Sequence, residues 1–132
     1  MKKQTVILDM MEWRALVHEL SIMEGVLDLI RASARERNIG KVNKIKLVIG
    51  KFTMIMPDSL QFSFQVLSQD ELFLNADLEI EERDIVISCE ECGQESVLLD
   101  AYSFLCPACG AARINMVSGR EMYIDHYEGD PN

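Results

Sequence analysis

The sequence is poor in proline, glycine and basic residues, and each shortage excludes a class of protein. Its 132 residues include only 3 Pro and 7 Gly, which excludes a collagen-like or low-complexity chain. Lys and Arg number 13 against 22 Asp and Glu, so the net charge is −9 and the cations that phosphate-rich partners require are scarce. No apolar run approaches the ~18 residues of a membrane span. We therefore expect a folded chain that binds neither nucleic acid nor a membrane.

A secretory signal is also missing. The short apolar stretch Val6-Ile7-Leu8 is interrupted by Asp9, Glu12 and Arg14, and no small-residue cleavage site follows it. We therefore expect a cytoplasmic protein. In that reducing compartment, paired cysteines more often hold a metal ion than form disulfides.

Two amphipathic helices are predicted. Ser21-Ile22-Met23-Glu24 has the form of a capping box at the start of the first helix, and Gly40 is placed to close it. Pro57 suits the first turn of the second helix. The apolar residues predicted to face inward on the first helix are Leu20, Ile22, Met23, Val26, Leu27, Leu29, Ile30 and Ala34. Those on the second are Leu60, Phe64 and Leu67.

Alternating apolar and polar residues predict three strands of one sheet, near residues 42–49, 78–81 and 122–125. Because residues 84–118 interrupt this series, the sheet has to be assembled across an inserted segment. We therefore expect an α+β fold with two helices on a mixed sheet. Residues 17–83 and 119–128 would form one domain, residues 84–118 a second, and residues 1–16 a poorly specified N-terminal extension.

The inserted segment contains the strongest motif, two Cys-x-x-Cys-Gly knuckles. Cys89 and Cys92 form the first pair, Cys106 and Cys109 the second, and thirteen residues separate the pairs. Each knuckle can direct two thiolates at one ion, and the two together supply the four sulfurs of a tetrahedral Zn²⁺ site. Four thiolates leave no open coordination position, so we expect a structural metal. Two alternatives remain, a rubredoxin-like iron site and a redox dithiol.

A second, weaker signal precedes the first helix, where His18 is followed by Glu19. An imidazole beside a carboxylate can bind a borderline cation such as Ni²⁺. A histidine at a helix entrance is nevertheless more often a surface or capping residue, so the pair by itself is weak evidence.

The ordered set of motifs resembles the HypA/HybF family of hydrogenase nickel-incorporation proteins. The set comprises His18-Glu19-Leu20-Ser21 before a helix, Ile49-Gly50 at a strand end, the aromatic residues of the second helix, the two knuckles and Gly119-Arg120-Glu121-Met122. The resemblance runs from residue 17 to about residue 127. It implies a mixed α/β nickel domain with a zinc domain inserted before its last strand.

This resemblance implies a nickel metallochaperone for [NiFe]-hydrogenase and not an enzyme. The implied partners are a HypB-type GTPase and the hydrogenase large-subunit precursor, and we expect a monomer or weak homodimer. By position, His18 would bind Ni²⁺ with the backbone of residues 17–19, Glu19 would assist, and the four cysteines would hold Zn²⁺. Asp58, Glu81 and His126 are auxiliary candidates. Some relatives also serve urease.

The start of the resemblance raises a hypothesis about the N-terminus. In the family the His-Glu pair follows the initiating Met, whose amine joins the nickel site, whereas here Val17 holds that position. We hypothesise that translation starts at position 17, because a valine codon such as GTG can initiate with Met. The competing functions are a zinc-ribbon interaction or transcription module without nickel, and a small iron redox protein. No nucleophile–base pair or phosphate loop favours an enzyme.

Overall fold

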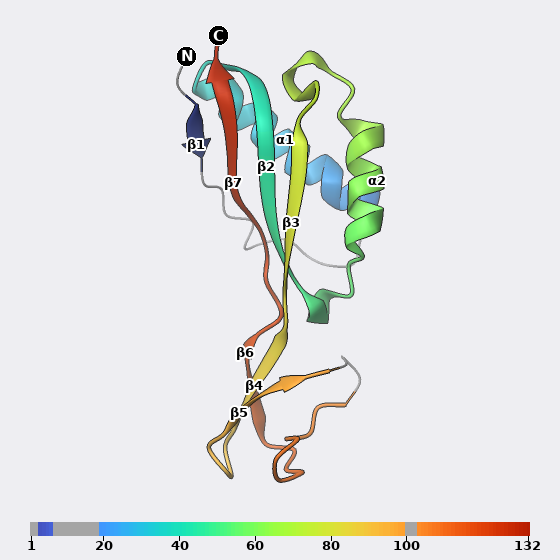
Figure 1. The fold of residues 1–132 in the computed structure, drawn as a ribbon, viewed down its shortest axis with the longest axis vertical. Coiled ribbons are helices and arrows are strands. Elements are labelled where there is room, and N and C mark those ends of the chain that lie inside the picture. Colours follow the sequence, from blue (N-terminus) through green and yellow to red (C-terminus); the bar gives the residue numbers. More distant parts are fainter. Residues whose placement is uncertain (1–2, 7–18, 100–102) are drawn as a thin grey trace.

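The computed structural model describes residues 3–6, 19–99 and 103–132, which form two sheets and two helices. The first sheet has four strands in the order β1-β7-β2-β3, and the second has three in the order β5-β4-β6. Figure 1 shows the three-stranded sheet at the opposite end of the long axis from both termini. Among the described residues, neither helix is both long and apolar enough to cross a bilayer. The bounds are β1 Gln4–Val6, α1 Glu19–Glu36, β2 Ile39–Gly50, α2 Pro57–Leu67, β3 Asp77–Arg83, β4 Ile85–Cys89, β5 Glu95–Leu98, β6 Ile114–Ser118 and β7 Met122–Pro131.

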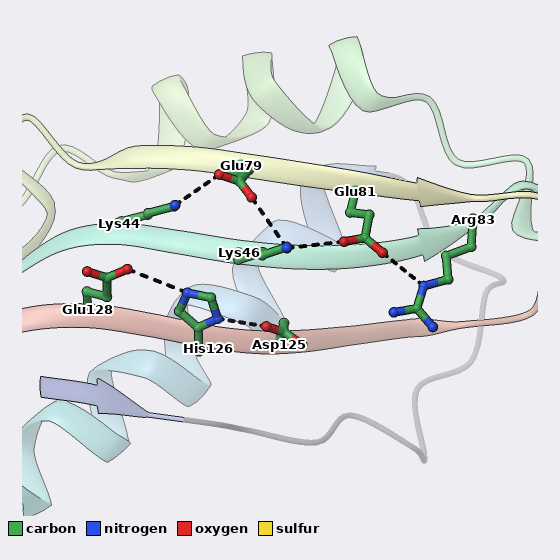
Figure 2. Close-up of polar contacts among 8 residues, drawn as sticks. All are labelled: Lys44, Lys46, Glu79, Glu81, Arg83, Asp125, His126 and Glu128. Carbon is green, nitrogen blue, oxygen red and sulfur yellow. Dashed lines mark hydrogen bonds and ion pairs between the residues drawn. The ribbon is translucent and has the colours of Figure 1, made fainter.

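The four-stranded sheet confirms the predicted mixed architecture. Strands β2 and β3 are parallel and are connected through α2, whereas β7 pairs with β2 in the antiparallel direction. Ile45, Leu47 and Ile49 of β2 are almost fully buried in the core shared with both helices, and Lys44 and Lys46, which alternate with them, lie on the other face (Figure 2). Helices therefore cover one face of this sheet, as strand alternation requires.

Helix α1 starts earlier than its sequence pattern suggested. Residues 19 and 20 are already helical, so Ser21 is not an N-cap and the predicted capping box is wrong. The C-terminal prediction is also wrong, because Asn38 adopts the left-handed conformation (φ 55°) while Gly40 belongs to β2. Asn is the residue that most readily replaces Gly there, since its short polar side chain tolerates positive φ.

Two residues that were predicted to face the core lie on the surface instead. Leu20 is 43% exposed and Leu29 is 41% exposed. The buried face of α1 is therefore narrower than the face predicted from its apolar residues. Helix α2 follows the prediction more closely: Pro57 occupies its first turn, and Leu60 and Phe64 are buried. Leu20 lines an open hollow together with residues of α2.

The N-terminal residues 1–16 were not predicted to contribute an element, yet Gln4–Val6 forms strand β1. It pairs with residues Tyr127–Gly129 of β7 in the antiparallel direction. Val6 is only 3% exposed and belongs to the main core. This short strand therefore covers one edge of the sheet.

The two sheets are joined by two short connections, which we call the junction between the sheets. Strand β3 leads into β4 through Asp84 alone, and β6 leads back into β7 through Gly119, Arg120 and Glu121. The amide of Phe52 donates to the carbonyl of Gly119 at 2.9 Å. Gly119 has φ +120°, and a Cβ there would lie 2.9 Å from the Cα of Ile85, so this position requires glycine.

An aromatic contact packs across the junction between the two sheets. The Phe52 ring, from the turn η1 (Lys51–Thr53), packs edge-to-face on Phe104 with centroids 5.5 Å apart. Arg120 lies over Phe52 at 5.7 Å, and Phe52 packs against the small core of the three-stranded sheet formed by Ile85, Ile87 and Leu98. A side chain from the first sheet thus completes the core of the second.

Removing the Phe52 ring should loosen the three-stranded sheet. We expect Phe52→Ala to lower its free energy of opening by about 1–3 kcal/mol, because the ring is only partly buried and a fully buried Phe is worth more. Amide hydrogen exchange at β4 measures this. Phe62→Ala is the matched control, since Phe62 is 64% exposed and its loss should leave exchange unchanged. Equal exchange in both variants would contradict the coupling.

Candidate metal centres

The four cysteines meet at one end of the three-stranded sheet. Their sulfur atoms all lie within 4.8 Å of one another, with Cys89 Sγ 3.6 Å from Cys109 Sγ and Cys92 Sγ 3.7 Å from Cys106 Sγ. Sulfurs at the corners of a tetrahedron with Zn–S bonds of about 2.3 Å would be separated by about 3.8 Å. The observed spacing therefore fits a tetrahedral four-sulfur metal centre.

Both knuckles have the same backbone fold. In each, the amide of the glycine donates to the carbonyl of the first cysteine: Gly93 to Cys89 at 2.9 Å, and Gly110 to Cys106 at 2.8 Å. The two glycines have φ values of 73° and 79°, in the left-handed region that favours glycine. The turn after each Cys-x-x-Cys pair therefore needs a positive φ, which explains the glycine at that position.

The environment of the thiols suits metal binding. Backbone amides of Cys109 and Ala108 lower the pKa of Cys106 to about 7 against the effect of burial. The amide of Ala111 also lowers the pKa of Cys109, but the Cys89 thiol, burial and the other thiols outweigh it and raise the value to about 12. Four adjacent sulfurs therefore cannot all ionise unless a cation neutralises them.

The second predicted site is described only in part. His18 lies outside the described residues, and Glu19 is the first described residue of α1. Glu19 lines an open hollow of about 440 Å³ together with Asp58, which belongs to the first turn of α2. The remaining lining residues are Leu20, Ser59, Phe62 and Ser63. Two carboxylates separated by 39 positions in sequence thus face one space, a juxtaposition that no local pattern could indicate.

The other auxiliary candidates lie on the helix-free face of the four-stranded sheet (Figure 2). Glu81 forms ion pairs with Lys46 at 3.1 Å and with Arg83 at 3.0 Å, and the hydrogen bonds from Arg83 and Lys46 lower its pKa. His126 contacts Asp125 at 2.7 Å and Glu128 at 3.6 Å. Neither residue lines the hollow that contains Glu19 and Asp58. The structure therefore groups Asp58 with Glu19 and leaves Glu81 and His126 in separate polar networks.

Comparisons with known proteins identify the family of the chain. Residues 17–129 match the family model described as hydrogenase/urease nickel incorporation, metallochaperone, HypA. The hydrogenase maturation factor HypA of Moorella thermoacetica is 40% identical over 114 residues, covering 86% of this chain and all of that protein. The homologue from Desulfatibacillum aliphaticivorans is 34% identical over 117 residues, covering 87% of this chain and 89% of its own length.

A solved structure has the same fold. The solution structure of the Ni metallochaperone HypA from Helicobacter pylori superposes with a TM-score of 0.59, at 17% identity, over 88% of this chain and 100% of that chain. At this identity the likeness concerns the fold alone, whereas the family model and the curated relatives extend over most of the sequence. The chain therefore belongs to the HypA family of hydrogenase maturation factors.

Proposed function

We propose that this protein is a nickel metallochaperone that delivers Ni²⁺ for the maturation of [NiFe]-hydrogenase. The observation that carries the proposal is the hollow shared by Asp58 and Glu19, the first described residue of α1. In the sequence, His18 directly precedes Glu19. His18 would bind Ni²⁺ through its imidazole, with the backbone of residues 17–19 and with Glu19 assisting. Asp58 would supply a further carboxylate oxygen. Few ligands at a helix entrance hold a cation loosely enough to release it.

The four-cysteine centre would have a different role. We assign it to structural Zn²⁺, held by Cys89, Cys92, Cys106 and Cys109, because four thiolates close the coordination shell and leave no position for a substrate. On this assignment residues 84–118 are a zinc-binding domain. Residues 17–83 and 119–128 are the nickel-binding domain, and the protein delivers metal without catalysing a reaction.

The partners follow from the role. The curated relatives are named hydrogenase maturation factors, so the recipient would be the hydrogenase large-subunit precursor, with a HypB-type GTPase acting beside it. The proposed location is the cytoplasm, because the four thiols would have to stay reduced to bind a metal ion.

A nickel titration tests the proposal. The zinc-loaded chain should bind about one Ni²⁺ in competition with a chelator, because His18, Glu19 and Asp58 would form a single ligand set. A form starting with Met at position 17 should bind more tightly, since its terminal amine adds a nitrogen ligand. Binding of Zn²⁺ alone by both forms would contradict the proposal and favour a zinc-ribbon interaction module.

A further inference from the structure

The open hollow lined by Leu20 and Phe62, together with the neighbouring exposed side chain of Val66 on α2, forms an apolar surface that we call the groove between α1 and α2. Phe62 is 64% exposed, Val66 47% and Leu20 43%, although all three are large apolar side chains. Phe62 and Val66 are one turn apart on α2, and Leu20 lines the same hollow as Phe62 from the α1 side. We call these three residues the groove floor. Clustered exposed apolar side chains between polar neighbours are typical of a protein-binding site.

The rim of this groove is acidic. Glu19 and Asp58 line the hollow at one end of it. Glu24 follows Leu20 by one turn, on the side of α1 from which Arg31 reaches the carbonyl of Leu67 at the end of α2. From residue 19 to residue 30 of α1, and along all of α2, the sequence contains no Lys or Arg. The groove therefore presents an apolar centre with negative charge beside it.

Arg31, the first basic residue on α1, does not neutralise the negative charge of the groove rim. Arg31 contacts Asp28 at 3.0 Å and Asp70 at 3.2 Å, and its guanidinium lies over Phe73 at 5.2 Å. Its charge is thus already paired with two carboxylates. The acidic rim remains available to a partner of the opposite charge.

Charge also argues against the other occupants. A second copy docked face to face would place the acidic rim against itself, because a two-fold interface pairs the same patch on both subunits. Residues 7–18 carry Asp9 and Glu12 against Arg14 alone, so they do not complement the rim either. A basic segment from a different protein fits both the charge and the apolar floor.

We propose that the groove between α1 and α2 docks a basic amphipathic segment of the protein that exchanges nickel with this chain. A large apolar side chain of that segment would rest on Phe62 and Val66, with a Lys or Arg residue against Glu24, which is outside the proposed nickel ligand set. This inference rests on the proposed function, because the hollow containing Glu19 and Asp58 opens at one end of the groove. Docking there brings the partner to the nickel ligands.

Binding measurements with two purified probes test the inference. The probes are the HypB-type GTPase and the hydrogenase large-subunit precursor from the same genome, titrated separately against the zinc-loaded full chain. Phe62→Ala should raise the Kd of at least one probe by about 30-fold, as truncation of an aromatic anchor does at an interface. Glu24→Lys should raise it by about 10-fold and make it less sensitive to salt.

Matched controls lie on the three-stranded sheet. Val117→Ala removes an apolar side chain that is 54% exposed, and Glu95→Lys reverses the charge of an exposed acid on β5. Both should leave the Kd unchanged. The inference is overturned if Phe62→Ala and Glu24→Lys bind like wild type, or if neither probe binds at about 0.1 mM.

Two further outcomes would show that the groove is occupied by something other than a basic segment of a partner protein. A lower Tm for Phe62→Ala in the isolated chain would mean that the chain's own residues cover the groove. A dimer that dissociates in this variant would mean that a second copy does. Either result overturns the inference. A nickel titration of Glu24→Lys separates this question from the proposed function, since Glu24 lies outside the hollow and normal nickel binding is expected even if docking fails.

Discussion

Replacing Cys109 by Ala is expected to abolish tight zinc binding and to unfold the segment around the knuckles. Cys109 Sγ is one of four sulfurs that all lie within 4.8 Å of one another, and its removal leaves an incomplete shell. Metal binding in small four-ligand sites contributes about 10–16 kcal/mol of apparent free energy at pH 7, far more than the small core of Ile85, Ile87 and Leu98 can supply. Cys109→Ala should therefore lose both its bound metal and the folded structure around the knuckles.

Metal analysis after dialysis against a chelator measures this effect. Wild type should retain about one Zn²⁺ per chain, and Cys109→Ala close to none. Ala108→Ser is the control, because it changes the same knuckle at an exposed position without touching a sulfur. Amide exchange along β4 should rise only in the cysteine variant. Zinc retained at wild-type strength by Cys109→Ala would mean that this thiol is not a ligand.

The second large effect concerns nickel. If His18 is the ligand we propose, His18→Ala should weaken Ni²⁺ binding by at least about 100-fold, because loss of a direct ligand costs more than the 10–100-fold typical of an outer-shell partner. His126→Ala is a strict control, since it removes the other histidine of the chain. His126 is held by Asp125 and Glu128 on the helix-free face, so its loss should change nickel affinity by less than about twofold.

Competition titrations with a coloured nickel chelator give both affinities under the same conditions. The nickel affinity of Asp58→Ala should lie between those of His18→Ala and His126→Ala if the Asp58 carboxylate supplies an oxygen ligand. The opposite pattern, with His126→Ala harmful and His18→Ala harmless, would move the nickel site to the polar network of Figure 2. Zinc content should stay constant throughout, because these residues lie outside the four-cysteine centre.

Sequence patterns predicted the elements whose signals are local. The spacing of the two knuckles and the glycine after each were sufficient to predict the metal centre, because a tight turn and two nearby thiolates are encoded within five residues. Pro57 likewise marked the first turn of α2. The alternation in β2 and β3 gave the correct inward faces, since strand periodicity depends only on the chain itself.

Features that depend on distant residues were missed. Ser21 has the sequence of an N-cap, but α1 is already helical at Glu19, so the local capping preference did not decide where the helix begins. Strand β1 is too short to show alternation and forms only because β7 offers an edge. The contact of Phe52 with Phe104 joins residues 52 positions apart. Asp58 lies 39 positions from Glu19 and was named as an auxiliary candidate only beside the family resemblance. No local pattern contains such pairs.

The strand order of the first sheet has a consequence for folding. Central strand β2 must pair with β7, which arrives only after the whole of residues 84–118 has been made. The Ser118 hydroxyl donates to the Asp84 carbonyl at 2.9 Å, so a folded insertion brings its two ends together. Metal-loaded knuckles would then shorten the effective loop between β3 and β7. Each halving of a loop saves about 0.6 kcal/mol of closure entropy, so early metal uptake should accelerate the slow pairing step of a long-range sheet.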